Sequence, residues 1–259
     1  MPFLRPLGPV LLLAALVALS ACKGKEERAE EHYQRALEFV ASGDAERAKI
    51  EFRNVFRLNG EHTQARLAFA RLLRDEGDVE RALSHYLLLA EQDRNSIEGQ
   101  RELAALALSA GDLGAAEAAV RRAFTLAPDD PEVRGLKATL DYREGSDRPA
   151  ALAMAEGVLA EAPGNVPANM VLIADRMNAE DPQGALVRAD AAIAALEAAG
   201  ADPDPGLHLA RLAALEATGD DAAVGLQLTR MAGLFPDDAA IGRALVQWRV
   251  AQGDLAGAE

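Results

Sequence analysis

The hydrophobic residues form one pattern in the first 21 residues and another after residue 31. A run of ten apolar residues, 10–19, follows a short start that carries one positive charge, Arg5. Ten helical residues span about 15 Å, half of a ~30 Å hydrocarbon core, so the run predicts a secretory signal over residues 1–21 rather than a membrane-spanning helix. After residue 31, stretches of about a dozen residues, typical of helices, alternate with short turns.

The turns recur with a period of 34 residues. Gly43-Asp44, Gly77-Asp78 and Gly111-Asp112 are 34 apart, and Gly219-Asp220 and Gly253-Asp254 repeat that spacing. We expect each glycine to end one helix in a left-handed conformation and each aspartate to accept hydrogen bonds from the first amides of the next helix. A fixed period of two helices indicates a repeat array in which each pair stacks on the next.

The interval from Gly145 to Gly219 is six residues longer than two periods. We place the extra residues at Ser146 and in a longer loop, 200–206, because its two prolines cannot continue a helix. The turn without a Gly-Asp pair falls at Glu180-Asp181-Pro182.

The composition favours helices over sheets. Half of the residues are hydrophobic but only 4% are aromatic, which is typical of helices that pack closely through alanine and leucine. The single cysteine excludes an internal disulfide and a multi-thiolate zinc site. A net charge of −14 argues against a nucleic-acid partner, because phosphate binding needs clustered lysine and arginine.

The sequence contains no recognisable catalytic group. The four histidines are far apart and none has a second ligand at metal-binding spacing. The glycines stand singly at turns instead of forming a phosphate-binding loop, and no serine or cysteine nucleophile has an identifiable partner. We therefore expect a protein that is not an enzyme and that binds no cofactor or metal.

The segment Leu19-Ser20-Ala21-Cys22 resembles the lipobox of bacterial lipoproteins. The resemblance implies cleavage before Cys22 and acylation of this cysteine, so that the protein contacts the membrane through a lipid anchor only. Lys23 in place of aspartate favours the periplasmic side of the outer membrane. An ordinary cleaved signal with an incidental cysteine is the alternative. The charged residues of segment 22–31 predict a solvated tether.

The period, together with its small residues, resembles the tetratricopeptide repeat. The match covers the array 32–259, about six repeats plus an incomplete seventh, and implies an all-α, right-handed superhelical solenoid of antiparallel helix pairs. With the turn glycines at the family's fifteenth position, the repeats run over 29–62, 63–96, 97–130, 131–165, 166–204, 205–238 and 239–259. The family's small positions are then held by Ala36, Ala70, Ala104 and Ala138, by Ala48, Ala82 and Ala116, and by Ala90 and Ala123.

The sequence also departs from the family pattern. The family's tryptophan at position four is replaced by His32, Arg66 and Gln100. The first helices of repeats five and six match poorly.

In this family the first helices of successive repeats line a groove that holds a peptide or a helix of a partner. Carried over residue by residue, the groove positions are Tyr33, Leu37, Leu67, Arg71, Arg74, Arg101, Leu108, Thr139, Tyr142, Arg143, Met170, Met177 and Asn178. The four arginines predict a positive patch that holds an acidic side chain or a C-terminal carboxylate. Alternatively, they are solvated or paired with Glu76, Glu102 and Glu144. The two methionines form an adaptable apolar contact or fill the core.

These features favour a non-catalytic scaffold, tethered through Cys22, whose groove binds a protein or peptide of the bacterial cell envelope. The chain is similar to tetratricopeptide lipoproteins of exopolysaccharide export and outer-membrane assembly. Alternatively, because the seventh repeat is incomplete, the repeats form the docking or regulatory N-terminal part of a longer protein whose catalytic or transport domain follows residue 259. Binding of an acidic polysaccharide along the arginines is a third hypothesis.

Overall fold

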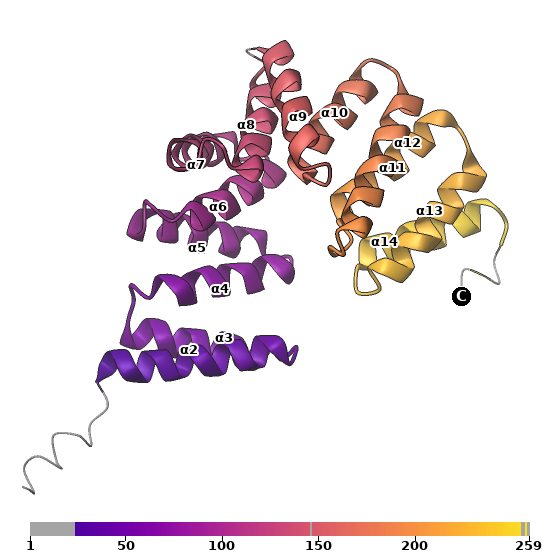
Figure 1. Cartoon of the computed structure of the whole chain (residues 1–259). Coiled ribbons are helices and arrows are strands. Elements are labelled where there is room, and N and C mark those ends of the chain that lie inside the picture. Colours follow the sequence, from indigo (N-terminus) through magenta and orange to yellow (C-terminus); the bar gives the residue numbers. More distant parts are fainter. Residues whose placement is uncertain (1–23, 146, 255–256, 258–259) are drawn as a thin grey trace, which may run out of the picture. The chain divides into compact units, whose positions relative to one another are not determined.

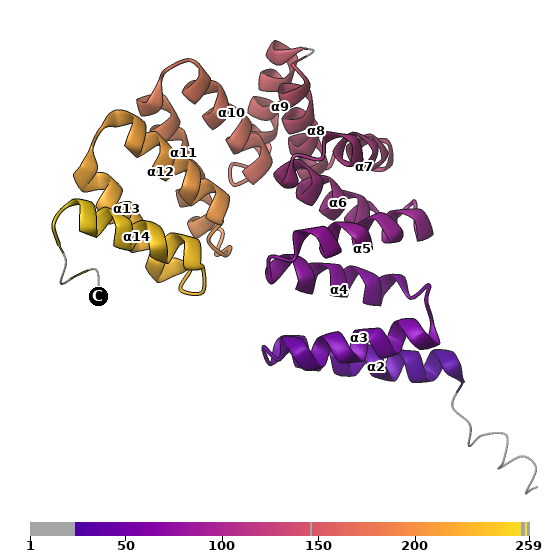
Figure 2. The same ribbon diagram turned by 180° about the vertical axis from the view of Figure 1, so that it is seen from behind.

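The computed structural model describes residues 24–145, 147–254 and 257, and the regular elements in these ranges are all α-helices. The chain divides into two compact units, unit 1 up to Leu106 and unit 2 from Ala107 on, with the division inside one helix. Within unit 1, consecutive helices lie side by side and antiparallel (Figure 1). Unit 2 is built in the same way, and Figure 2 shows its last two helices packed together.

The helices form pairs, as the period predicts. The first helices of the pairs are α2 (Lys25–Ala41), α4 (Thr63–Asp75), α6 (Ile97–Ala110), α8 (Pro131–Glu144), α10 (Val166–Asn178), α12 (Pro205–Thr218) and α14 (Ala239–Ala251). The second helices are α3 (Ala45–Leu58), α5 (Val79–Gln92), α7 (Leu113–Leu126), α9 (Arg148–Glu161), α11 (Pro182–Ala198) and α13 (Asp221–Leu234). The predicted all-α fold of antiparallel helix pairs is confirmed.

The turn chemistry is also confirmed. Gly43, Gly77, Gly111, Gly145, Gly219 and Gly253 all have a positive φ, between 71° and 79°. After Gly43, Gly77, Gly111 and Gly219 the next residue is an aspartate that caps the following helix, as when Asp44 accepts a hydrogen bond from the amide of Arg47 at 3.0 Å. Because glycine lacks a Cβ atom, it adopts this left-handed conformation without the strain that other residues incur.

Two boundary predictions are wrong. Helix α2 begins at Lys25, so most of the segment expected to be a solvated tether is helical. The loop expected over 200–206 ends earlier, because Pro205 is the first residue of α12 and Asp204 caps that helix by accepting from the amide of Leu207 at 2.8 Å. Proline lacks an amide hydrogen, which the first turn of a helix does not use. The expected insertion at Ser146 lies outside the described residues.

The small positions that the sequence identifies are buried where helices pack, except Ala90, which is half-buried. Ala36, Ala48, Ala82 and Ala116 have no exposed surface. In unit 2, Ala138 and Ala155 have none either and pack with Val171 between α8, α9 and α10. A small side chain at these places lets the backbones of two helices approach closely.

Polar contacts replace the tryptophan that the family has at its fourth position. His32 contacts Glu51, Arg66 contacts His85, and His208 contacts Gln227. In each pair the second residue follows the first by 19 positions and lies on the second helix of the same repeat. Because Arg66, His208 and Gln227 are buried, these contacts satisfy polar groups that would otherwise be costly in the interior.

The turn without glycine carries backbone strain. Glu180 has φ 56°, the only positive φ of a non-glycine residue in the described chain. We expect Glu180→Gly to raise the free energy of unfolding by about 1 kcal/mol by removing this strain. Thermal unfolding followed by circular dichroism measures the gain, roughly 2–4 °C for a chain of this size.

Gly219→Ala is the matched control, because it introduces a side chain at a turn with a positive φ instead of removing one. Gly219 has φ 75°, and a Cβ atom there would meet no neighbour within 4 Å. It is expected to lose a similar amount of stability through strain alone. Equal midpoints for Glu180→Gly and the parent protein would contradict the prediction.

Candidate functional site: the first-helix groove of unit 1

The first helices of unit 1 line an open groove. Its volume is about 630 Å³, and its walls come from α2, α4 and the start of α6. We call it the first-helix groove. Of the predicted groove residues, it contains Tyr33, Leu37, Leu67 and Arg71.

The floor of the groove is apolar. Leu37 and Leu67 are half-buried and Leu72 is buried. The ring of Tyr33 lies 4.9 Å from the ring of His62, whose Nδ1 accepts the amide of Ala65 and so caps α4. Burial, with the charge of Glu30, raises the pKa of Tyr33, so its hydroxyl is neutral at pH 7. The groove therefore offers half-buried apolar side chains beside a neutral hydroxyl.

Arg71 in the groove and Arg74, one turn further along α4, are both paired with carboxylates. Arg71 donates to Glu98 and, at 2.7 Å, to Glu102. Arg74 donates to Glu102 and, at 2.9 Å, to Asp75. Burial lowers the pKa of Arg71, but its hydrogen bonds to Glu98 and Glu102 outweigh this and give a net rise. Burial also lowers the pKa of Arg74, and the charge of Glu102 likewise helps to outweigh it.

The expected positive patch is therefore absent at these two positions of unit 1. Two arginines and three carboxylates, Asp75, Glu98 and Glu102, leave a net charge of −1. The side chains of Glu98 and Asp75 are 55% and 62% exposed, so they can accept further hydrogen bonds. Of the expected alternatives, pairing with Glu102 is found, whereas Glu76 pairs with Lys49 at 2.8 Å.

The other predicted groove residues lie elsewhere. Arg101 is half-buried on α6. In unit 2, Arg143 donates to the backbone oxygen of Leu108. The hydroxyl of Tyr142 accepts from Asn178 at 3.0 Å and from Arg148 at 2.9 Å, so the structure brings together two of the residues carried over from the family.

The two methionines pack against the core of unit 2. Met170 and Met177 are half-buried and pack against the apolar cluster of unit 2 that includes Ile173, Ala185 and Leu207. This agrees with the core-filling alternative. Cys22, the predicted acylation site, lies outside the described residues.

Sequence reasoning missed a buried network beside the groove helices. Arg66, 6% exposed, donates to Gln92 at 2.8 Å, to the backbone oxygen of Gly60 and to Nδ1 of His85 at 3.3 Å. Burial, together with the charges of Arg66 and Arg81, lowers the pKa of His85 to about 4, so this ring is neutral at pH 7. Sequence reasoning also missed Glu98, although Glu98 and Glu102 are four residues apart and lie on one face of α6.

Solved structures share this architecture. A tetratricopeptide repeat protein from Parabacteroides merdae aligns with a TM-score of 0.58 and 15% identity over 88% of each chain. The fold is that of tetratricopeptide repeat proteins. Yeast Tom70 aligns with a TM-score of 0.63 and 15% identity over 90% of this chain, which spans 48% of Tom70. PilW, a widely conserved type IV pilus biogenesis factor, aligns with a TM-score of 0.57 and 16% identity over 84% of this chain and 98% of its own.

At 15–16% identity these likenesses concern the tetratricopeptide fold alone. No family model matches the sequence, and no curated protein sequence does so either. Among the described residues, no three histidine, cysteine, aspartate or glutamate side chains gather to hold a metal ion. None of the helices within those residues has the length and apolar character needed to cross a membrane.

Proposed function

We propose that the protein is a non-catalytic scaffold whose first-helix groove binds a segment of a partner protein. The segment carries an apolar side chain followed by a lysine or arginine. The observation that carries this proposal is the combination of an apolar floor, formed by Leu37, Leu67 and Leu72, with a rim whose net charge is −1.

The size and chemistry of the groove suit a peptide. Binding sites of about 300–1,000 Å³ that mix apolar walls with a few polar groups are typical of small ligands and short peptide segments, and this groove falls in that range. An apolar side chain of the partner would cover the half-buried leucines. A neighbouring cation would reach the exposed oxygens of Glu98 or Asp75. A neighbour of the same fold is described as having an unusual peptide-binding site.

The test uses peptides selected from a random library displayed against the purified protein. We expect the combined variant Leu37→Ala/Leu67→Ala to bind the selected peptides at least 10-fold more weakly, because it removes apolar surface worth ~0.8 kcal/mol per buried CH₂ group. Fluorescence polarisation with labelled peptides measures the affinity, and circular dichroism confirms that the variant keeps its helices.

The matched control is Leu87→Ala/Leu88→Ala. These two leucines lie on α5, a second helix of the same unit, and each is 43% exposed. The control should leave peptide affinity within twofold. If both double variants weaken binding equally, or if neither does, the groove is not the binding site.

We further propose that the mature protein begins at Cys22 and is held at the periplasmic face of the outer membrane by acylation of this cysteine. The support is the segment Leu19-Ser20-Ala21-Cys22, with a signal-like apolar run before it. The partner would then be an envelope protein, for instance a component of exopolysaccharide export or outer-membrane assembly.

Replacing Cys22 tests the anchor. The variant Cys22→Ser is expected to move from the membrane fraction to the soluble periplasmic fraction, because it removes the thiol that carries the lipid. Cell fractionation with immunoblotting measures the distribution. A variant that remains in the membrane fraction as fully as the parent protein would refute acylation at this position.

A further inference from the structure

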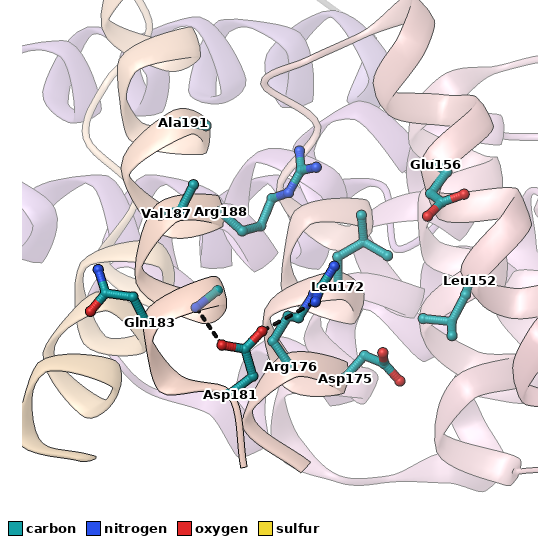
Figure 3. A pocket seen from close by; sticks show the side chains of 11 residues that line it. Leu152, Glu156, Leu172, Asp175, Arg176, Asp181, Gln183, Val187, Arg188 and Ala191 are labelled. Atoms are coloured by element: carbon teal, nitrogen blue, oxygen red, sulfur yellow. Dashed lines mark hydrogen bonds and ion pairs between the residues drawn. The ribbon is translucent and has the colours of Figure 1, made fainter. Parts of the chain in front are cut away.

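Unit 2 contains a second pocket, of about 490 Å³, between α9, α10 and α11 (Figure 3). Helices α9 and α11 are second helices of their pairs, so different elements build this pocket and the first-helix groove of unit 1. Its walls carry apolar side chains and five charged ones.

Three of the five charged groups already have partners within unit 2. Arg176 donates to Asp181 at 3.1 Å, and Asp181 also caps α11 by accepting from the amide of Gly184 at 2.8 Å. Asp175 accepts from Arg148 at 2.7 Å. These contacts hold Arg176, Asp181 and Asp175 in the wall of the pocket. The charge of each side chain is already balanced by a partner within unit 2.

The two other charged groups, Arg188 and Glu156, form no hydrogen bond or ion pair with any residue in the described part of the chain. Arg188 is half-buried on α11, and Glu156 is exposed on α9. Figure 3 shows them on opposite sides of the pocket, with the side chain of Leu172 lying between the two helices that carry them. The guanidinium of Arg188 is therefore not matched by a carboxylate within the described residues, so its donors can bind a carboxylate of a partner.

Apolar surface lies next to these unpaired charges. Leu152 and Leu172 are half-buried in the wall, and Val187 is 62% exposed on α11 one residue before Arg188. Covering this exposed valine with an apolar side chain of a ligand favours binding, because it removes apolar surface from water.

We propose that this pocket is a second binding site, for a segment of a partner protein that carries both an acidic and a basic side chain. The acidic side chain binds Arg188, where carboxylate and guanidinium can form two parallel hydrogen bonds. The basic side chain binds Glu156 on the opposite wall. An apolar side chain between them packs on Leu172 and Val187.

The arrangement of charges predicts selectivity as well as binding. A segment with acidic side chains alone would bring like charge toward Glu156, and one with basic side chains alone would do so toward Arg188. The charges also fix the direction in which a given segment binds, because reversing it would place its acid beside Glu156 and its base beside Arg188. This selectivity differs from that of the first-helix groove, which favours a cation next to an apolar side chain.

The experiment uses 12-residue peptides selected from a random library on the purified protein. Peptides that bind at this pocket are those that Arg188→Gln weakens at least 10-fold but that Leu37→Ala/Leu67→Ala leaves within twofold. We expect each of them to contain an acidic and a basic residue and to be weakened by Glu156→Gln as well. Arg121→Gln is the matched control, because Arg121 is an exposed arginine of the same unit on α7.

A charge exchange gives the sharpest readout. For one such peptide, a second version is made in which its acid and its base are exchanged. The parent protein should prefer the original at least 10-fold, and the double variant Arg188→Glu/Glu156→Arg should prefer the exchanged version. The proposal is overturned if folded Arg188→Gln weakens no peptide, if the weakened peptides carry one sign of charge only, or if the double variant keeps the original preference.

Discussion

Replacing Ala116 by leucine is expected to lower the free energy of unfolding by about 1–3 kcal/mol. Ala116 lies on α7 and has no exposed surface, like Ala48 and Ala82 at the same position of the two preceding repeats. The larger side chain cannot enter a fully buried site unless the helices move apart or neighbouring side chains leave their preferred rotamers. Urea unfolding followed by circular dichroism measures the loss as a lower midpoint.

The control makes the same substitution on the same helix. Ala118 is exposed on α7, so Ala118→Leu should stay within about 0.5 kcal/mol of the parent protein. Both variants change helix propensity equally, so the difference between them isolates the cost of packing. Equal midpoints would show that Ala116 is not at a tightly packed helix crossing.

Replacing Gly225 by alanine is expected to destabilise the protein by about 1–2 kcal/mol, although alanine is the better helix former. Gly225 is buried on α13, and a Cβ atom there would overlap the indole ring of Trp248. Trp248 packs against the apolar cluster of unit 2 that includes Leu215 and Leu228. The ring must leave this position to admit a methyl group, and its displacement from the cluster costs more than the propensity gain of roughly 1 kcal/mol.

Gly233→Ala on the same helix should change the stability of the protein in the opposite direction. Gly233 is exposed, and a Cβ atom there would meet no neighbour within 4 Å. Only the propensity gain then remains, so this variant is expected to be up to about 1 kcal/mol more stable than the parent protein. Tryptophan fluorescence during urea unfolding follows both variants, because the chain has one tryptophan. If Gly225→Ala stabilises the protein, the packing of the Trp248 ring does not require a glycine at position 225.

The sequence was sufficient for the helix pairs because local interactions specify them. A glycine that ends a helix and an aspartate that caps the next act within a few residues of the chain, and their spacing of 34 shows directly in the sequence. The same local rules located the irregular turn at Glu180. They were less reliable at Lys25 and Pro205, where charged residues and a proline predicted non-helical structure but each residue begins a helix.

The pairing of charges was decided by tertiary structure. Arg71 lies in the wall of the first-helix groove, and its carboxylate partners lie 27 and 31 residues further along the chain. The sequence alone could not show whether Glu76, Glu102 or solvent would pair with the arginines, because several acidic residues lie at comparable separations. In the folded chain Glu98 and Glu102 of α6 form ion pairs with the arginines of α4, and this turns the expected positive patch of unit 1 into a rim of net charge −1.

For Arg188 and Glu156, the tertiary structure shows instead that the charges are left unpaired. The sequence gives them no distinguishing feature, since both belong to helices rich in alanine and charged residues. Only the packing of α9, α10 and α11 shows that their neighbours Asp175, Arg176 and Asp181 are already paired while these two are not. The sequence therefore determined the helices and their repeat, because backbone conformation responds to nearby residues. Which charges remain available to a partner depends on side chains that meet only after the helices have packed.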